Sequence, residues 1–282
     1  MTNKTIWMVL LAGVALLVML PGVSCGGDDG DPTDIGADDA RDVVDTGELC
    51  PPAANPAIPE TRLRTLNVTA PEAMRNRVLQ SLINTSMENE DFLWLVRFTG
   101  VGTGTITMRT GSGGKVAGTA CTYRFLEPTY PAREMTMAES GLDFALSGDP
   151  IAQLDVPLWS EGTAYPEDPM LVMPLRELEI NGTFSSNHLY VGSYDAVSEL
   201  WTDGGDLSGK MTVADTRLVV IPDLGMTLCG LLSGDTGVAS DPSDDCTRDP
   251  STWAHAPDTD VGGLPAYAMA ATFAASPVHI QD

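Results

Sequence analysis

The sequence predicts a mainly β fold, most simply a sandwich-like single domain with one or two short packed helices. Short runs rich in branched and aromatic residues are separated by clusters of Gly and Pro, as expected for strands joined by turns. Residues 266–280 alternate apolar side chains with period two, whereas residues 71–84 repeat them with a period near four. An alternative division into two smaller domains falls near residues 130–165, around which prolines cluster.

The first expected elements are a strand and a helix. Residues 63–69 form a short strand with Leu66 and Val68 on one face. The following Thr-Ala-Pro-Glu of residues 69–72 has the pattern of a capping box, with Pro in the first helical turn. Apolar residues at 74, 78 and 82 then predict an amphipathic helix that ends near Asn84.

Strands dominate the middle of the chain. Residues 92–98, 105–110 and 116–125 are expected to be extended, because they are dense in aromatic and branched side chains. The Gly-rich residues 100–104 and 111–114 lack the Gly-Lys-Ser/Thr ending of a phosphate-binding loop. Both are therefore interpreted as hairpin turns.

Two more extended segments follow, at residues 170–184 and 189–194. Pro174 interrupts the first and predicts an edge position or a bulge, because Pro cannot donate to the strand ladder.

The C-terminal third is expected to contain one short helix and a final buried strand. Asp223 can cap the helix, and Gly234 can end it. This helix is expected to turn four side chains inward: Leu224, Leu228, Leu231 and Leu232. Residues 266–280 form the last strand.

The N-terminus has the layout of a secretory signal peptide. Lys4 precedes an uncharged apolar run at residues 6–20, which is shorter than the ~20 residues that a membrane-spanning helix requires. Residues 1–24 are therefore the expected signal peptide. Cys25 follows at the cleavage point and resembles the lipobox cysteine of bacterial lipoproteins, although Gly22 stands where a lipobox usually has Leu. The alternative is an ordinary cleaved signal peptide in which Cys25 is incidental.

Residues 25–49 are expected to form a lipidated cysteine and a disordered acidic tether. After Cys25 this segment carries nine acids against one base, Arg41, and has no apolar periodicity. Such a sequence cannot bury enough apolar surface to fold, and its charges repel one another. The β-rich globular domain is expected to span residues 50–282.

Cysteine counting favours an oxidising compartment. Lipidation of Cys25 leaves four cysteines, an even number that suits disulfides. Cys229 with Cys246 is the shortest closure, and Cys50 would then pair with Cys121. Free buried thiols in one of these pairs are the alternative.

The net charge of −24 excludes nucleic acid as a partner, because the phosphate backbone would be repelled. Calcium is the one metal that the acidic loop suggests, since Ca²⁺ takes carboxylate ligands; a solvated loop is the alternative, and no other cofactor is expected. The candidate ligands are Asp235, Asp241, Asp244, Asp245, Asp258 and Asp260.

No catalytic residue is assigned from the sequence. The three histidines lie in different segments, and no Gly-x-Ser-x-Gly elbow is present. A sugar-stacking platform is a further option, although scattered tryptophans more often belong to the core. Its candidates are Trp94, Trp159, Trp201 and Trp253.

Four loose motifs resemble uncharacterised bacterial lipoproteins of the myxobacterial type. They are Gly-Gly-Asp-Asp-Gly-Asp at residue 26, Leu-Ser-Gly followed by Val-Ala-Asp from residue 207, Leu-Cys-Gly-Leu-Leu at residue 228, and Asp-Thr-Asp leading to Phe-Ala-Ala from residue 258. The resemblance implies a lipid-anchored extracytoplasmic protein of the cell envelope, held at the outer membrane, but no activity.

The expected function is that of a non-catalytic binding or structural protein, whose partners are the membrane, through the lipid, and an envelope protein or glycan. The alternatives are a secreted hydrolase with an unrecognised site and an envelope carrier of an apolar ligand.

Overall fold

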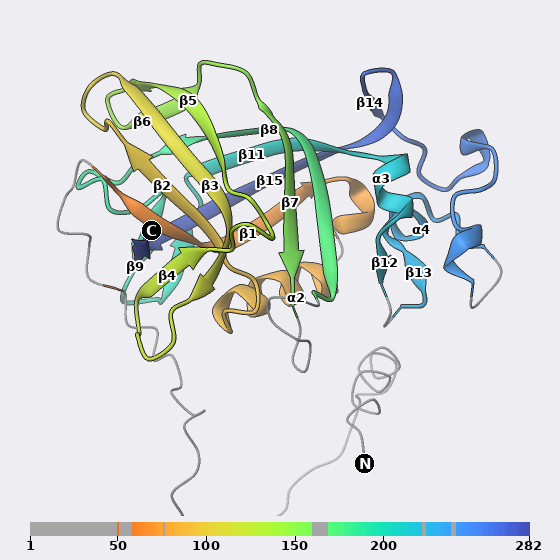
Figure 1. Cartoon of the computed structure of the whole chain (residues 1–282), viewed down its shortest axis with the longest axis horizontal. Coiled ribbons are helices and arrows are strands. Elements are labelled where there is room, and N and C mark those ends of the chain that lie inside the picture. Colours follow the sequence, from red (N-terminus) through yellow and green to blue (C-terminus); the bar gives the residue numbers. More distant parts are fainter. Residues whose placement is uncertain (1–49, 51–57, 76, 160–168, 222–223, 238–240) are drawn as a thin grey trace, which may run out of the picture. The chain divides into compact units, whose positions relative to one another are not determined.

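The structure is a computed structural model that describes Cys50 and residues 58–75, 77–159, 169–221, 224–237 and 241–282, apart from the side chains of residues 78 and 82 (Figure 1). The expected signal peptide, Cys25 and the acidic tether lie outside the described residues. All described residues belong to one compact unit that spans Asp45–Asp282.

Eight antiparallel strands form a closed ring, because each pairs with two neighbours and the last pairs with the first. The prediction of a mainly β domain with short packed helices is confirmed, and the strands of its facing layers belong to one continuous sheet (Figure 1). In ring order the strands are β1 (Glu60–Ala70), β2 (Trp94–Thr99), β3 (Thr105–Lys115), β5 (Arg133–Ser140), β6 (Asp143–Leu146), β8 (Leu171–Thr183), β11 (Gly205–Thr212) and β15 (Leu264–Pro277).

Further strands extend the ring or lie beside it. β7 (Ile151–Leu158) pairs with β8, and β14 (Thr259–Val261) pairs with β15. β4 (Thr122–Phe125) continues from β3 and pairs in parallel with the C-terminal β16 (His279–Gln281). Two small hairpins form their own sheets. They are β9 (Ser193–Asp195) with β10 (Leu200–Thr202), and β12 (Val220–Ile221) with β13 (Met226–Thr227).

The helices are short. α2 (Arg77–Glu88) is the longest described one, and α3 (Val213–Arg217) and α4 (Leu228–Ser233) lie near the end of β11. The 3-10 turns are η2 (Glu72–Met74), η3 (Pro242–Asp244) and η4 (Pro250–Thr252).

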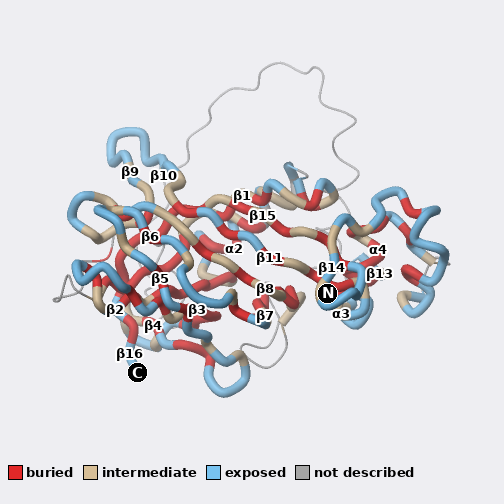
Figure 2. The backbone as a smooth tube through the Cα atoms, turned by 90° about the horizontal axis from the view of Figure 1, so that it is seen from above, coloured by how far each residue is buried: buried red, intermediate tan, exposed pale blue. Residues whose placement is uncertain are grey.

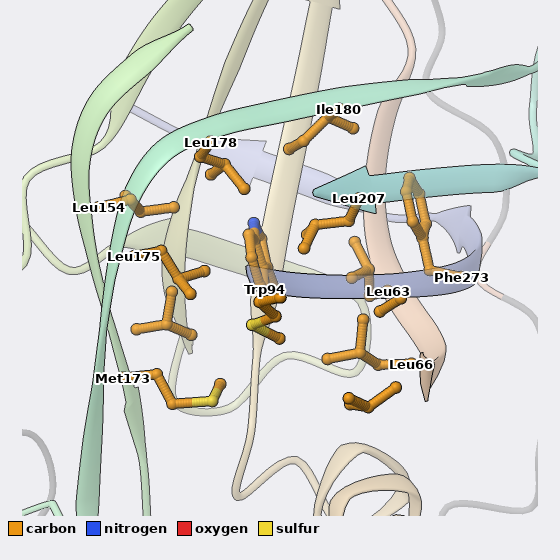
Figure 3. Packing of buried hydrophobic residues seen from close by; sticks show 14 of the residues in the cluster. Leu63, Leu66, Trp94, Leu154, Met173, Leu175, Leu178, Ile180, Leu207 and Phe273 are labelled. Atoms are coloured by element: carbon orange, nitrogen blue, oxygen red, sulfur yellow. The ribbon is translucent and has the colours of Figure 1, made fainter. Parts of the chain in front are cut away.

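Buried apolar side chains from all eight ring strands form one cluster, and Figure 3 shows part of it. Trp94 lies among them, and its indole N–H donates to the Thr110 hydroxyl at 2.7 Å, so the polar atom of this buried ring has a partner. Burial of this cluster is the main stabilising term of the fold. One contributor from each strand, in ring order, is Leu63, Val96, Met108, Met135, Phe144, Leu178, Leu207 and Phe273.

A second, smaller cluster lies where the described domain begins. Cys50 forms a disulfide with Cys121, and both pack against apolar side chains of β2, β4 and β16. Beside it, Glu90 accepts from the Tyr123 hydroxyl at 2.6 Å and pairs with Arg62 at 2.9 Å. The first described residue is therefore fastened covalently to the turn between β3 and β4.

The prediction of a turn at residues 111–114 is wrong. These residues belong to β3 and are all buried. A Cβ atom on Gly113 would lie 2.5 Å from Cδ1 of Leu95, and one on Gly111 would lie 2.9 Å from the Ala132 Cα. Glycine is needed here because Leu95 and Ala132 of the same chain pack directly against the backbone of β3, and not because the chain turns.

The predicted capping box is wrong too. β1 remains paired with β15 as far as Ala70, so Thr69 is extended in the ladder and cannot cap a helix. The helix runs to Glu88 rather than Asn84. Its polar side chains accept hydrogen bonds from the backbone of β1: the side-chain amide oxygen of Asn84 accepts from the Leu66 N–H at 3.1 Å. Gln80 accepts in the same way from Val68 at 2.7 Å.

Pro174 lies in the part of β8 that pairs with β7 and not with β11. Three residues later Glu177 has a positive φ of 47°, beside the register shift between β8 and β11. Both the edge position and the bulge that Pro174 predicts are found within this strand. The final strand is confirmed as well, with Tyr267, Met269 and Phe273 buried in β15.

Candidate functional site

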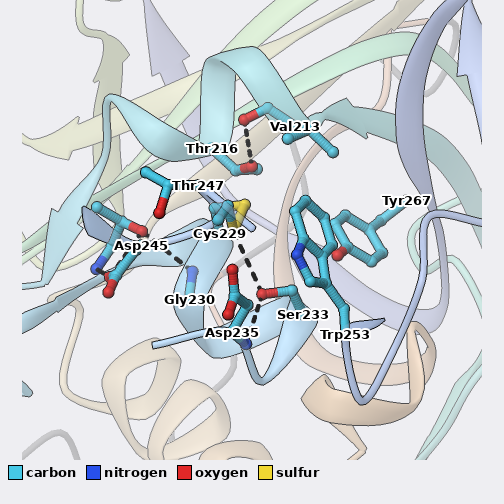
Figure 4. Close-up of a disulfide and its surroundings, with 12 residues drawn as sticks. Val213, Thr216, Cys229, Gly230, Ser233, Asp235, Asp245, Thr247, Trp253 and Tyr267 are labelled. Atoms are coloured by element: carbon cyan, nitrogen blue, oxygen red, sulfur yellow. Dashed lines mark hydrogen bonds between the residues drawn. A yellow bond between two sulfur atoms is a disulfide. The ribbon is translucent and has the colours of Figure 1, made fainter. Parts of the chain in front are cut away.

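The described residues of the candidate calcium loop lie among four short helical elements, α3, α4, η3 and η4, which together are called the cap of the domain (Figure 4). The Thr227 hydroxyl caps α4 by accepting from the Gly230 N–H at 3.0 Å, and Gly234 ends the helix with a φ of 68°. The helix therefore starts at Leu228, and the prediction that Asp223 caps it is wrong; Asp223 itself lies outside the described residues. Leu224, expected to point inward, is 43% exposed.

A disulfide between Cys229 and Cys246 joins α4 to the far end of the acidic loop. Both sulfurs are buried, and the Ser233 hydroxyl lies 3.2 Å from the Cys246 sulfur. Together with Cys50–Cys121, this is the pairing that the sequence analysis names first. Four of the five cysteines are thus paired with one another.

Asp245 is buried beside this disulfide and holds three segments together. Its carboxylate accepts from the Thr227 N–H at 2.5 Å, the Thr227 hydroxyl at 3.0 Å and the Gly237 N–H at 2.9 Å. A Cβ on Gly230 would lie 2.6 Å from its Oδ2. The carboxylate therefore acts as an internal acceptor that positions the start of α4 (Figure 4).

Asp235 is only 2% exposed and forms an ion pair with the guanidinium of Arg248. Arg248 also donates to the Thr236 carbonyl oxygen at 3.2 Å, which fixes the guanidinium over the loop. The buried negative charge thus has a positive partner, as a buried carboxylate requires.

The other four candidate ligands cap separate turns or line the surface. Asp241 accepts from the N–H and hydroxyl of Ser243, and these hydrogen bonds lower the pKa of its carboxyl. Asp258 accepts from the Ala268 N–H at 2.8 Å, and Asp260 from the Gly263 N–H at 3.0 Å. Among the described residues, no three His, Cys, Asp or Glu side chains gather in a way that could hold a metal ion.

Asp244 borders an open surface depression of about 470 Å³. The depression is wide and mixes polar with apolar lining, so it offers no enclosed surface for a small molecule. Its lining residues are Thr236, Gly237, Asp244, Thr247 and Arg248.

The tryptophans separate into two kinds. Trp94, Trp159 and Trp253 are buried, whereas Trp201 is half-buried on the β9–β10 hairpin. Its ring centroid lies 4.6 Å from that of Tyr194 and 6.1 Å from that of Tyr190. The sequence-based platform of four tryptophans is therefore reduced to Trp201, supported by two tyrosines that the sequence analysis did not single out.

The histidines lie in three unrelated settings. His279 is 3.2 Å from a carboxylate oxygen of Glu60, at the C-terminal strand. The ring of His188 packs edge-on against Phe184, and the His255 carbonyl oxygen accepts from the Tyr267 hydroxyl. The structure does not bring these three histidines together.

Comparison with known proteins gives no relative: no family model, no curated protein and no solved structure matches the chain. Over the described part of the chain, no helix has the length and apolarity needed to cross a membrane. The two disulfides are consistent with a domain that folds outside the cytoplasm.

Sequence reasoning missed the β9–β10 hairpin and the residue at its base, Asp203. The sequence analysis placed one strand at residues 189–194, whereas β9 begins at Ser193 and the strands are only three residues long. The available signal was the pair Gly192 and Gly204, which flank a segment with two aromatic residues. This signal could not be interpreted from the sequence, because the residues that bond to Asp203 lie on the distant strands β1 and β15.

Proposed function

We propose that this chain is an extracytoplasmic lipoprotein, anchored through a lipid on Cys25 and followed by a disulfide-linked β domain. The observation that carries the proposal is the disulfide pairing. Because Cys50, Cys121, Cys229 and Cys246 pair with one another, no cysteine of the chain remains as an intramolecular partner for Cys25. A thiol at the end of a signal peptide, in a compartment that oxidises the other four, suits a lipid-modified cysteine.

The proposed role of the anchored domain, at the outer membrane of the cell envelope, is to bind an envelope protein or glycan without catalysis. Three observations support it. Apolar side chains of the ring strands pack together inside the ring (Figure 3). The buried carboxylates of Asp235 and Asp245 are engaged in internal bonds. The projecting β9–β10 hairpin, in contrast, offers exposed apolar side chains to a partner.

Metabolic labelling with an alkyne fatty acid tests the anchor. The wild-type chain should take up the label and fractionate with membranes, whereas Cys25→Ser should do neither. The Cys229→Ser/Cys246→Ser variant is the matched control, because it also lacks cysteines, those of one disulfide, and should retain the label. Mass spectrometry that found an unmodified thiol at residue 25 of the exported protein, or an intact leader, would overturn the proposal.

A further inference from the structure

The β9–β10 hairpin projects from the ring as a separate two-stranded sheet (Figure 2). At its tip the side chain of Val197 is 96% exposed and that of Leu200 is 64% exposed. A two-stranded hairpin is marginally stable in water unless other groups support it. The described residues provide such support in two places.

The first support is at the base of the hairpin. The carboxylate of Asp203 accepts from the Thr65 hydroxyl at 2.7 Å, from the Asn67 amide at 2.6 Å, and from the Thr272 hydroxyl. These donors lie on β1 and β15, two neighbouring strands of the ring that pair with each other. Gly192 and Gly204 meet backbone to backbone beside it, and a Cβ on Gly192 would lie 2.8 Å from the Gly204 nitrogen. The hairpin is thus fixed at its base.

The second support is aromatic. Tyr194 and Trp201 face each other across the two strands, with their rings tilted by 39°, and Tyr190 packs against Trp201 from the preceding segment. Cross-strand aromatic pairs stabilise hairpins. Because the strand side chains alternate, Leu200 points to the opposite face from Trp201 and does not contribute to this stack.

The charge on this segment has one sign. Between Arg176 and Lys210 the sequence contains no Lys or Arg, and at the tip the exposed Asp195 and Glu199 flank Val197. Such a surface repels anionic lipid headgroups and attracts a basic partner. An exposed apolar tip on a rigid mount, bordered by carboxylates, therefore matches an apolar contact surrounded by Lys or Arg.

We propose that the β9–β10 hairpin is a docking element for a basic segment of another protein. Val197 and Leu200 contact apolar side chains of that segment, and Asp195 and Glu199 pair with its cations. The inference rests on the proposed function, because it names the partner that the anchored domain would bind.

The test uses the mature protein, expressed with its native leader and purified in detergent, and a synthetic peptide of alternating Leu and Lys as the probe. Trp201 reports binding, because the other three domain tryptophans are buried. The peptide should change its fluorescence, and Val197→Ser/Leu200→Ser should weaken binding about tenfold, since two apolar contacts are lost. Glu199→Gln should weaken binding and reduce its salt dependence without changing the size of the side chain.

Leu218→Ser is the matched control, because Leu218 is 83% exposed and lies outside the hairpin. Equal binding by all variants would mean general attraction to an acidic protein and would overturn the proposal. Binding to phosphatidylcholine vesicles that depends on Val197 and Leu200 would overturn it in favour of a membrane contact, and binding of a neutral chitooligosaccharide in favour of a glycan. Mass measurement of Cys25 on the same sample tests the anchor separately.

Discussion

Replacing Gly113 by Ala tests whether the Gly-rich part of β3 is a packed strand. A methyl group there would lie 2.5 Å from Cδ1 of Leu95, whose side chain is fully buried. Forcing an extra methyl into a packed core costs about 1–3 kcal/mol. For a domain of this size a loss of about 2 kcal/mol lowers Tm by about 4–8 °C. In an exposed turn, the same change would raise stability by about 0.4–1 kcal/mol through the unfolded state.

The assay is urea unfolding monitored by circular dichroism, repeated in a double-mutant cycle. Leu95→Ala alone should cost about 2–5 kcal/mol by leaving a cavity, and Gly113→Ala should cost less in that background because its methyl then has space. Gly148→Ala is the matched control: its Cβ would lie at an ordinary 3.6 Å from the Thr136 side chain. A stabilising Gly113→Ala, or strictly additive costs, would refute the packing argument.

Two further predictions concern the cap and its neighbours. The Cys229→Ser/Cys246→Ser variant should unfold at a lower guanidinium concentration, because opening a loop with a sequence separation of 17 removes about 3 kcal/mol of constraint on the unfolded chain; an unchanged midpoint would contradict this. Burial raises the pKa of the Tyr267 phenol to about 12 from its usual value near 10. Because the neutral phenol is favoured in the folded state, its contribution is complete below pH 10 and is lost as the pH rises to 12. Unfolding free energies from pH 8 to 12 should therefore fall more for the wild type than for Tyr267→Phe, and parallel curves would refute the assignment.

The fold class was predictable because alternation survives in the strands that carry the core. β15 shows it most clearly: its buried residues Tyr267, Met269, Ala271 and Phe273 follow one another at a spacing of two, on the face that packs into the cluster. A pattern of this kind depends only on the strand's own sequence. The closure of the ring depends on which strands pair, and that information is spread over distant segments.

Glycine was the main source of error. The same residue supplies a positive φ in the turn at Gly100, where φ is 82°, and close packing at Gly113. Sequence alone cannot separate these uses, because the difference is made by Leu95 across the ladder. The N-terminus of α4 shows the same dependence on distant residues. Asp and Thr are both good capping residues, and Thr227 rather than Asp223 caps α4. The carboxylate of Asp245, 18 residues away, holds Thr227 by accepting from its N–H and hydroxyl.

The two disulfides lie where the strand ladder cannot hold the chain. Cys50 precedes β1 and is joined to Cys121 in the turn before β4, whereas Cys229 lies in a helix of six residues, too short to be stable by itself. Both disulfides are consistent with an oxidising compartment that keeps these bonds formed. Only the Cys50–Cys121 bond lies next to the acidic segment that leads back to Cys25, so this bond is the point at which a pull on the proposed anchor would reach the ring.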